Sequence, residues 1–96
     1  MIVHIVMFKF KEENKEANIL KAKVMLEALE EKIEPLLAME VGVDFSKTER
    51  AFDLSLYSTF NSKEDLSVYA THKEHLEVVS FIKEVTEISK VVDYEK

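Results

Sequence analysis

AMEVGVDFSKTERAFDLSLYSTF, residues Ala38–Phe60, contains two segments in which apolar and polar side chains alternate. In the first segment Met39, Val41 and Val43 alternate with polar or small residues, and in the second the alternation runs from Phe52 to Phe60. Successive side chains of a β-strand point to opposite faces of a sheet, so a period of two predicts strands. The short polar connection SKTER predicts that these two strands form a hairpin.

A helical pattern precedes this hairpin. Between Glu13 and Lys32, apolar residues recur at spacings of three and four and form one stripe: Ile19, Ala22, Leu26, Leu29 and Ile33. We expect this stripe to pack on the sheet. A second, narrower apolar edge of Leu20, Val24 and Ala28 indicates either the cap of a cavity or contact with another helix. Pro35 ends the helix, because its ring cannot continue the hydrogen-bond ladder.

The segment Ile2–Phe10 also alternates and predicts a first strand. One of its faces carries Ile2, His4, Val6, Phe8 and Phe10, and the other carries Val3, Ile5, Met7 and Lys9. Both faces are largely apolar, so we expect both to be covered.

A second helical region follows the hairpin. In NSKEDLSVYATH, Asn61 or Ser62 can cap a helix, and an acidic residue three positions later can complete the cap. The helical pattern continues with four residues expected to be buried: Leu76, Val79, Ile82 and Val85. A break at Thr71–Glu74 would turn the flanking side chains in different directions, whereas an unbroken helix would keep them on one face. ISKVVDYE predicts a short last strand.

The order of these elements is β, α, β, β, α, β, which predicts one α+β domain over residues 1–96 with a ferredoxin-like fold. Its four-stranded antiparallel sheet would carry the helices on one face and leave the other face uncovered. We assign Val6, Phe8 and Phe10 to the uncovered face. Its apolar character predicts that a second copy covers it and forms a homodimer.

Composition narrows the classes of function. The formal net charge is −6, spread along the chain, so a nucleic acid or an anionic membrane is not an expected partner. The chain has no cysteine, which fits a reducing compartment, and we expect the protein to be cytoplasmic. No apolar run approaches the roughly 20 residues of a membrane-spanning helix.

A cluster of residues that can carry acid–base chemistry lies in SVYATHKEHLEV, Ser67–Val78. It contains Tyr69, His72 and His75 at successive spacings of three, and His4 lies on the first strand. Histidine exchanges protons near neutral pH, and a phenol can donate a hydrogen bond to a carbonyl or an enolate. The alternative is a structural role, in which His75 caps a helix and Tyr69 packs at a rim.

Metal binding is not expected. The spacing of four that is typical of a helical zinc pair is absent, and no motif fixes a third ligand. We therefore assign no metal and no cofactor to this chain.

Three segments together resemble the stress-responsive A/B barrel domain (Dabb) of the dimeric α/β-barrel superfamily: HIVMFKFK, VYATHKEH and VVDYE. The resemblance covers nearly the whole chain. It implies a dimer whose two sheets face each other, with a cavity between sheet and helices in each protomer. By similarity to a plant member, olivetolic acid cyclase, Tyr69 and His75 match catalytic residues, His4 matches a histidine of the pocket, and His72 matches the other histidine of the pair.

The resemblance implies a small apolar or carbonyl-bearing ligand and, if the protein is an enzyme, cofactor-free acid–base catalysis of the cyclase or isomerase type. Seven residues are expected to line the pocket: Val6, Phe8, Leu20, Val24, Leu56, Val78 and Phe81. One alternative is a non-enzymatic stress-responsive or structural barrel protein. The other is a monooxygenase-like barrel.

Overall fold

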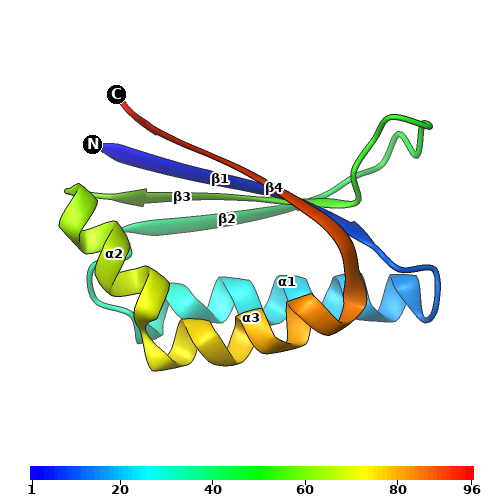
Figure 1. The fold of residues 1–96 in the computed structure, drawn as a ribbon, viewed down its shortest axis with the longest axis horizontal. Coiled ribbons are helices and arrows are strands. Elements are labelled where there is room, and N and C mark those ends of the chain that lie inside the picture. Colours follow the sequence, from blue (N-terminus) through cyan, green and yellow to red (C-terminus); the bar gives the residue numbers. More distant parts are fainter.

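The computed structural model describes residues 1–96 as a four-stranded antiparallel sheet with helices against one face (Figure 1). The elements follow in the order β1 (Ile2–Phe10), α1 (Lys15–Lys32), β2 (Ala38–Val43), β3 (Leu54–Phe60), α2 (Lys63–Thr71), α3 (Lys73–Val85) and β4 (Thr86–Glu95). The strand order in the sheet is β2-β3-β1-β4. The predicted ferredoxin-like arrangement is confirmed, with the second helical region divided into α2 and α3.

Strand β1 turns one of its two faces toward the helices, the face with Ile2, His4, Val6, Phe8 and Phe10. Ile2, Phe8 and Phe10 belong to the buried core, and Val6 packs against it. The prediction that Val6, Phe8 and Phe10 lie on the uncovered face is therefore wrong. Both sets of β1 side chains are apolar, so alternation alone did not identify the face that meets the helices. The uncovered face, called the open face below, carries Val3, Ile5, Met7 and Lys9 on this strand.

Helix α1 buries the predicted stripe: Ile19, Ala22, Leu26 and Leu29, followed by Ile33 directly after the helix. Leu20 and Val24 are 62% and 67% exposed. A helix turns by about 100° per residue, which places these two side chains opposite the stripe. They do not line a space between helices and sheet, so that part of the predicted pocket is wrong.

Helix α3 buries Val78 and Ile82. Leu76 was expected to be buried as well but is 52% exposed. The helix begins at Lys73, and its buried side runs through residues 78 and 82, so Leu76 lies on a different side. None of the three helices combines the length and apolar character needed to cross a membrane.

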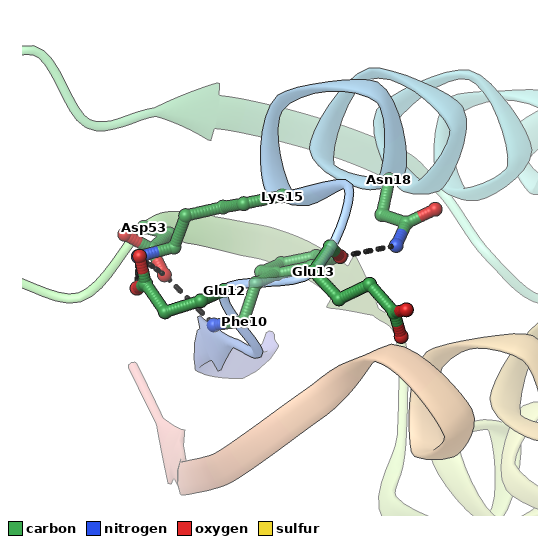
Figure 2. Close-up of polar contacts among 6 residues, drawn as sticks. All are labelled: Phe10, Glu12, Glu13, Lys15, Asn18 and Asp53. Carbon is green, nitrogen blue, oxygen red and sulfur yellow. Dashed lines mark hydrogen bonds and ion pairs between the residues drawn. The ribbon is translucent and has the colours of Figure 1, made fainter.

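A polar clasp holds the start of β3 to the connection between β1 and α1 (Figure 2). The Asp53 carboxylate accepts a hydrogen bond from the Phe10 N–H at 2.7 Å and lies 3.6 Å from Lys15 Nζ. Lys15 also pairs with Glu12 at 2.9 Å, and this hydrogen bond raises the pKa of Lys15. The Asp53 N–H donates to the Phe8 carbonyl at 2.9 Å. One residue thus fixes two chain segments that are distant in sequence.

Replacing Asp53 with Ala should lower the free energy of unfolding by about 1–2 kcal/mol, because the half-buried Phe10 N–H loses its acceptor. Asp53→Asn keeps an acceptor oxygen and should cost less. Urea denaturation measures both, with Glu13→Ala as the control, since Figure 2 shows Glu13 accepting only through its backbone carbonyl. Equal losses in Asp53→Ala and Glu13→Ala would contradict the clasp.

Candidate functional site

The site is built around Tyr69, which α2 projects into the core. Its side chain is 1% exposed and packs against Phe60, with ring centroids 5.1 Å apart. The hydroxyl is buried and makes no hydrogen bond to any protein group. Burial also raises the pKa of this phenol, so it stays protonated and remains a donor. A buried donor without a partner is unusual in a folded protein, because its lost hydration is not compensated.

His75 lies against Tyr69 from the first turn of α3. The two ring centroids are 4.3 Å apart, with an angle of 41° between the planes. His75 Nδ1 lies 3.0 Å from the Ala70 carbonyl oxygen. A carbonyl can only accept, so Nδ1 carries the hydrogen and Nε2 is left with a free lone pair. Burial lowers the pKa of His75 from its ordinary 6.5, an effect that the Ala70 hydrogen bond partly offsets. The imidazole is therefore neutral at neutral pH.

His4 approaches Tyr69 from β1, on the face of the sheet that meets the helices. Its ring centroid lies 6.2 Å from that of Tyr69 in an edge-on arrangement of 66°. Its Nδ1 is hydrogen-bonded to the carboxylate of Asp93 on β4. Asp93 is directly opposite His4 in the register of the two strands. This pairing orients the imidazole as the orienting carboxylates of catalytic histidines do.

Asp93 was not among the residues predicted for the site. Its strand was predicted, but the partner of a residue in a sheet depends on register, which one strand pattern does not give. The signal that could have found it is the antiparallel pairing of the first and last strands. Ile2 lies opposite Glu95, so two residues further into the pair His4 lies opposite Asp93.

His72 has a different role from the other two histidines. The chain leaves the helical conformation there, with φ −66° and ψ 138°, and His72 caps the start of α3. Its Nδ1 accepts a hydrogen bond from the Glu74 N–H at 3.1 Å. The break at this residue starts α3 in a new direction and returns His75 to Tyr69. The structure thus shows the broken form of the helix, with the histidine cap at residue 72 and not at residue 75.

Replacing His72 with Ala should cost about 1 kcal/mol of folding stability, the usual effect of losing a helix cap. His72→Asn supplies an amide oxygen at the same position and should stay within a few tenths of a kcal/mol of the wild type. Thermal and chemical denaturation measure the difference. If the two variants lose equal stability, the cap interpretation fails.

The remaining predicted pocket residues belong to the core or its margin. Phe8, Leu56 and Val78 are buried, and Val6 and Phe81 are half-buried against the same core. None of these residues lines the surface depression of about 410 Å³ that lies between α2, the start of β1 and the end of β4. Among its lining residues are Leu66 and Ser67 of α2 and Asp93 of β4. Asp93 is the one member of the polar cluster that lines this depression; His4, to which it is hydrogen-bonded, and the two rings of Tyr69 and His75 do not line it.

Metal ligation finds no support in the arrangement of side chains. No group of three or more His, Cys, Asp or Glu side chains is placed to hold a metal ion. The residues that converge are two imidazoles, one phenol and one carboxylate. Together they can bind an oxygen atom of a ligand and exchange protons with it.

Comparisons with known proteins agree with this architecture. A family model described as the stress responsive A/B barrel domain matches residues 2–96. A dimeric protein of unknown function and ferredoxin-like fold from Bacteroides fragilis is 33% identical, with a TM-score of 0.90 over 99% of this chain and 95% of that chain. A protein from Arabidopsis thaliana is 24% identical, with a TM-score of 0.87 and coverage of 100% and 95%.

A hydroxynitrile lyase from Passiflora edulis is 20% identical, with a TM-score of 0.86 over 97% of this chain and 90% of that chain. At these identities, the Passiflora and Arabidopsis structures show the fold alone. No match is found among curated protein sequences.

Proposed function

The chain belongs to the stress-responsive A/B barrel family, and from that premise we propose that it binds a small carbonyl-bearing metabolite at the cluster of His4, Tyr69 and His75. The proposed chemistry is cofactor-free proton transfer, as in a cyclase, lyase or isomerase. The observation that carries the proposal is the Tyr69 hydroxyl, a buried donor without a protein partner, on a ring that has the imidazoles of His75 and His4 as neighbours.

Tyr69 would donate its hydrogen bond to the carbonyl oxygen of the ligand. Such a bond satisfies the orphan hydroxyl, and it strengthens when negative charge develops on that oxygen. A raised pKa suits this role, because the phenol must keep its proton when an enolate forms beside it. The site therefore favours ligands with an accepting oxygen over purely apolar ones.

His75 would act as the base. Its Nε2 would take a proton from the carbon next to the carbonyl; the electrons of that C–H bond would form the C=C bond of an enolate, while the π electrons of the C=O bond move to the oxygen. The lowered pKa of His75 keeps the acceptor lone pair available at neutral pH. In an isomerisation, His75 would return the proton to a different carbon of the substrate. In a cyclisation, the enolate carbon would attack a second carbonyl carbon of the ligand, and His75 would give its proton to the alkoxide that forms.

His4 would orient the ligand from the sheet side. The Asp93 carboxylate holds its Nδ1, so the free Nε2 side can meet a second polar group of the ligand. The depression between α2 and β4 offers the approach from solvent, since Asp93 lines it. Val6 and Phe81 are half-buried and supply apolar surface beside the core.

A second candidate is a non-catalytic role, favoured by one observation. Tyr69 is 1% exposed and packs tightly against Phe60, so a ligand must displace packed side chains to reach the hydroxyl. A stress-protective or structural barrel protein would need no such opening. The two candidates differ in one result: whether any small molecule binds at the cluster.

We also propose that the protein is a homodimer formed through the open face of the sheet. The 33% identical Bacteroides fragilis protein is dimeric, and the open face of this chain carries exposed apolar side chains such as Met7 and Val92. A single uncovered sheet face of this kind is typical of an interface. Sedimentation of the wild type at micromolar concentration should give the mass of two chains.

The test of the site is a panel of small ketones, aldehydes and hydroxy acids screened by thermal shift, followed by NMR in D2O. Binding should raise the melting temperature, and proton transfer should replace hydrogen by deuterium at the carbon next to the carbonyl. Binding without deuterium exchange would support a carrier and contradict catalysis. If no carbonyl compound binds, the proposed site fails and the non-catalytic candidate stands.

A further inference from the structure

Ser58 is the polar member of the row of side chains that β3 turns toward the helices. The other residues on this face of the strand are Leu54, Leu56 and Phe60, and all three belong to the core. Ser58 is buried as deeply as they are, with 0% of its surface exposed. It is also the smallest residue of the four, so it fills less of the space above the sheet than its neighbours do.

The register of the sheet places Ser58 beside the Tyr69 cluster. Ser58 lies directly opposite His4 in the pairing of β1 with β3. Side chains opposite each other on neighbouring strands have Cβ atoms about 5 Å apart. Phe60, two positions further along the same face, packs against Tyr69, and His4 lies edge-on to the same ring. Both sheet residues that lie against Tyr69 are therefore immediate neighbours of Ser58.

The Ser58 hydroxyl offers an acceptor on the sheet side of the cluster. It donates its hydrogen to the His4 backbone carbonyl, with 3.2 Å between the two oxygens. A hydroxyl has one hydrogen and two lone pairs, so this bond leaves Ser58 Oγ able only to accept. Tyr69 has the opposite need, because its hydroxyl holds a hydrogen and has no acceptor. The two hydroxyls are not bonded to each other, so a bound molecule can satisfy both.

We propose that the ligand of this site carries a hydroxyl group on the carbon next to its carbonyl, and that Ser58 is the residue that selects for this hydroxyl. The carbonyl oxygen would accept from Tyr69, and the ligand hydroxyl would donate to Ser58 Oγ. A hydroxyketone satisfies both groups, whereas a simple ketone satisfies Tyr69 alone. This inference rests on the proposed function, because it requires that a carbonyl compound binds beside Tyr69.

His4 offers a second acceptor on the same side, but burial favours Ser58 as the selective one. The Asp93 carboxylate holds His4 Nδ1, so Nε2 of His4 can accept a hydrogen bond. The His4 side chain is 16% exposed, which lets water serve this nitrogen when no ligand hydroxyl is present. Ser58 is fully buried, so an analogue without the hydroxyl leaves its oxygen unpaired. A site that hydrogen-bonds a substrate hydroxyl through a buried group discriminates strongly against the analogue that lacks it.

Matched ligand pairs that differ by one hydroxyl test the inference: acetoin against butanone, and benzoin against deoxybenzoin. In titration calorimetry, the wild type should bind the hydroxyketone of each pair about 10-fold more tightly. In Ser58→Ala the difference should fall to about 2-fold or less, while affinity for the simple ketone stays within about 3-fold of the wild type. Thr59→Ala is the matched control, because Thr59 is also a buried hydroxyl residue of β3 but lies on the other face. This variant should keep the full preference.

The outcomes separate this inference from the proposed function. If the wild type binds both members of each pair equally, the role of Ser58 is overturned, whereas binding beside Tyr69 still stands. A preference that persists in Ser58→Ala would assign the ligand hydroxyl to His4 and would also overturn the role of Ser58. If neither member of any pair binds, the proposed function fails, and the inference fails with it. Retained affinity of Ser58→Ala for the simple ketones shows, in the same titrations, that the variant site is intact.

Discussion

Tyr69→Phe is expected to raise the free energy of unfolding of the ligand-free protein by about 1–2 kcal/mol and to weaken ligand binding at least 10-fold. The two effects have one cause. The Tyr69 hydroxyl is buried without a protein partner, so its removal relieves an uncompensated loss of hydration. The same hydroxyl is the proposed donor to the ligand oxygen, and Phe cannot replace that bond. A gain in stability with a loss of function is the signature of a group retained for binding.

Urea denaturation and thermal shift with a binding ketone measure the two effects on the same sample. Tyr57→Phe is the control, since Tyr57 lies on the open face of the sheet, away from the cluster. Removal of the Tyr57 hydroxyl should leave ligand affinity unchanged. If Tyr69→Phe instead destabilises the protein, the hydroxyl has a structural partner, and the proposed site loses the observation on which it depends.

The elements of the fold could be predicted because each carries its own period. The alternation in β1, β2 and β3 and the stripe of α1 are local patterns, and they hold in the structure. The orientation of β1 could not be predicted in the same way. Both of its faces are apolar, so the choice of face depends on packing with helices far along the chain, and Phe8 and Phe10 were placed on the wrong side.

The site was predictable in part for a similar reason. Tyr69 and His75 are close in sequence, and the resemblance to a known family placed His4 with them, as the ring distances in the structure now also do. Asp93 was not predicted, because its contact with His4 depends on the register between β1 and β4. The structural alternative, in which His75 caps a helix, is wrong, since the break at His72 makes the His72 imidazole the cap of α3.

The break at His72 also explains how a small chain positions an imidazole beside a buried phenol. In a continuous helix, residues three and six positions after Tyr69 would share its face only approximately. Here α3 starts again after the cap, and His75 Nδ1 donates to the Ala70 carbonyl at the end of α2. One hydrogen bond therefore links the two helices, fixes the tautomer of His75 and points its free nitrogen away from the backbone. The stability of this corner is therefore coupled to the availability of the free imidazole nitrogen of His75.

His75→Gln should lower the rate of deuterium exchange on a bound ketone by about 10²- to 10⁴-fold, the usual contribution of a general base. Glutamine can still donate to the Ala70 carbonyl but cannot take a proton. His72→Asn is the matched control, because it changes a neighbouring histidine while keeping the helix cap. An exchange rate that His75→Gln leaves unchanged would assign the proton transfer to another group, with His4 the next candidate.

The pH dependence follows from the lowered pKa of His75. The wild-type exchange rate should stay level from pH 8 down to 6.5 and fall only at lower pH, where the imidazole gains its proton.

The free energy of unfolding should also fall as the pH falls. In the unfolded chain His75 has its ordinary pKa of 6.5, so below pH 6.5 the unfolded state binds the proton first. The folded state therefore loses stability as the pH falls from 6.5 to the lower pKa that His75 has in the folded state. Other acidic groups also titrate in this range, so the measured quantity is the difference between wild type and His75→Gln. Relative to the variant, the wild type should lose stability between pH 7 and 5, and His72→Asn should lose it to the same extent as the wild type. A difference that does not change with pH would mean that His75 is not buried in its neutral form, and the assignment of the base would fail with it.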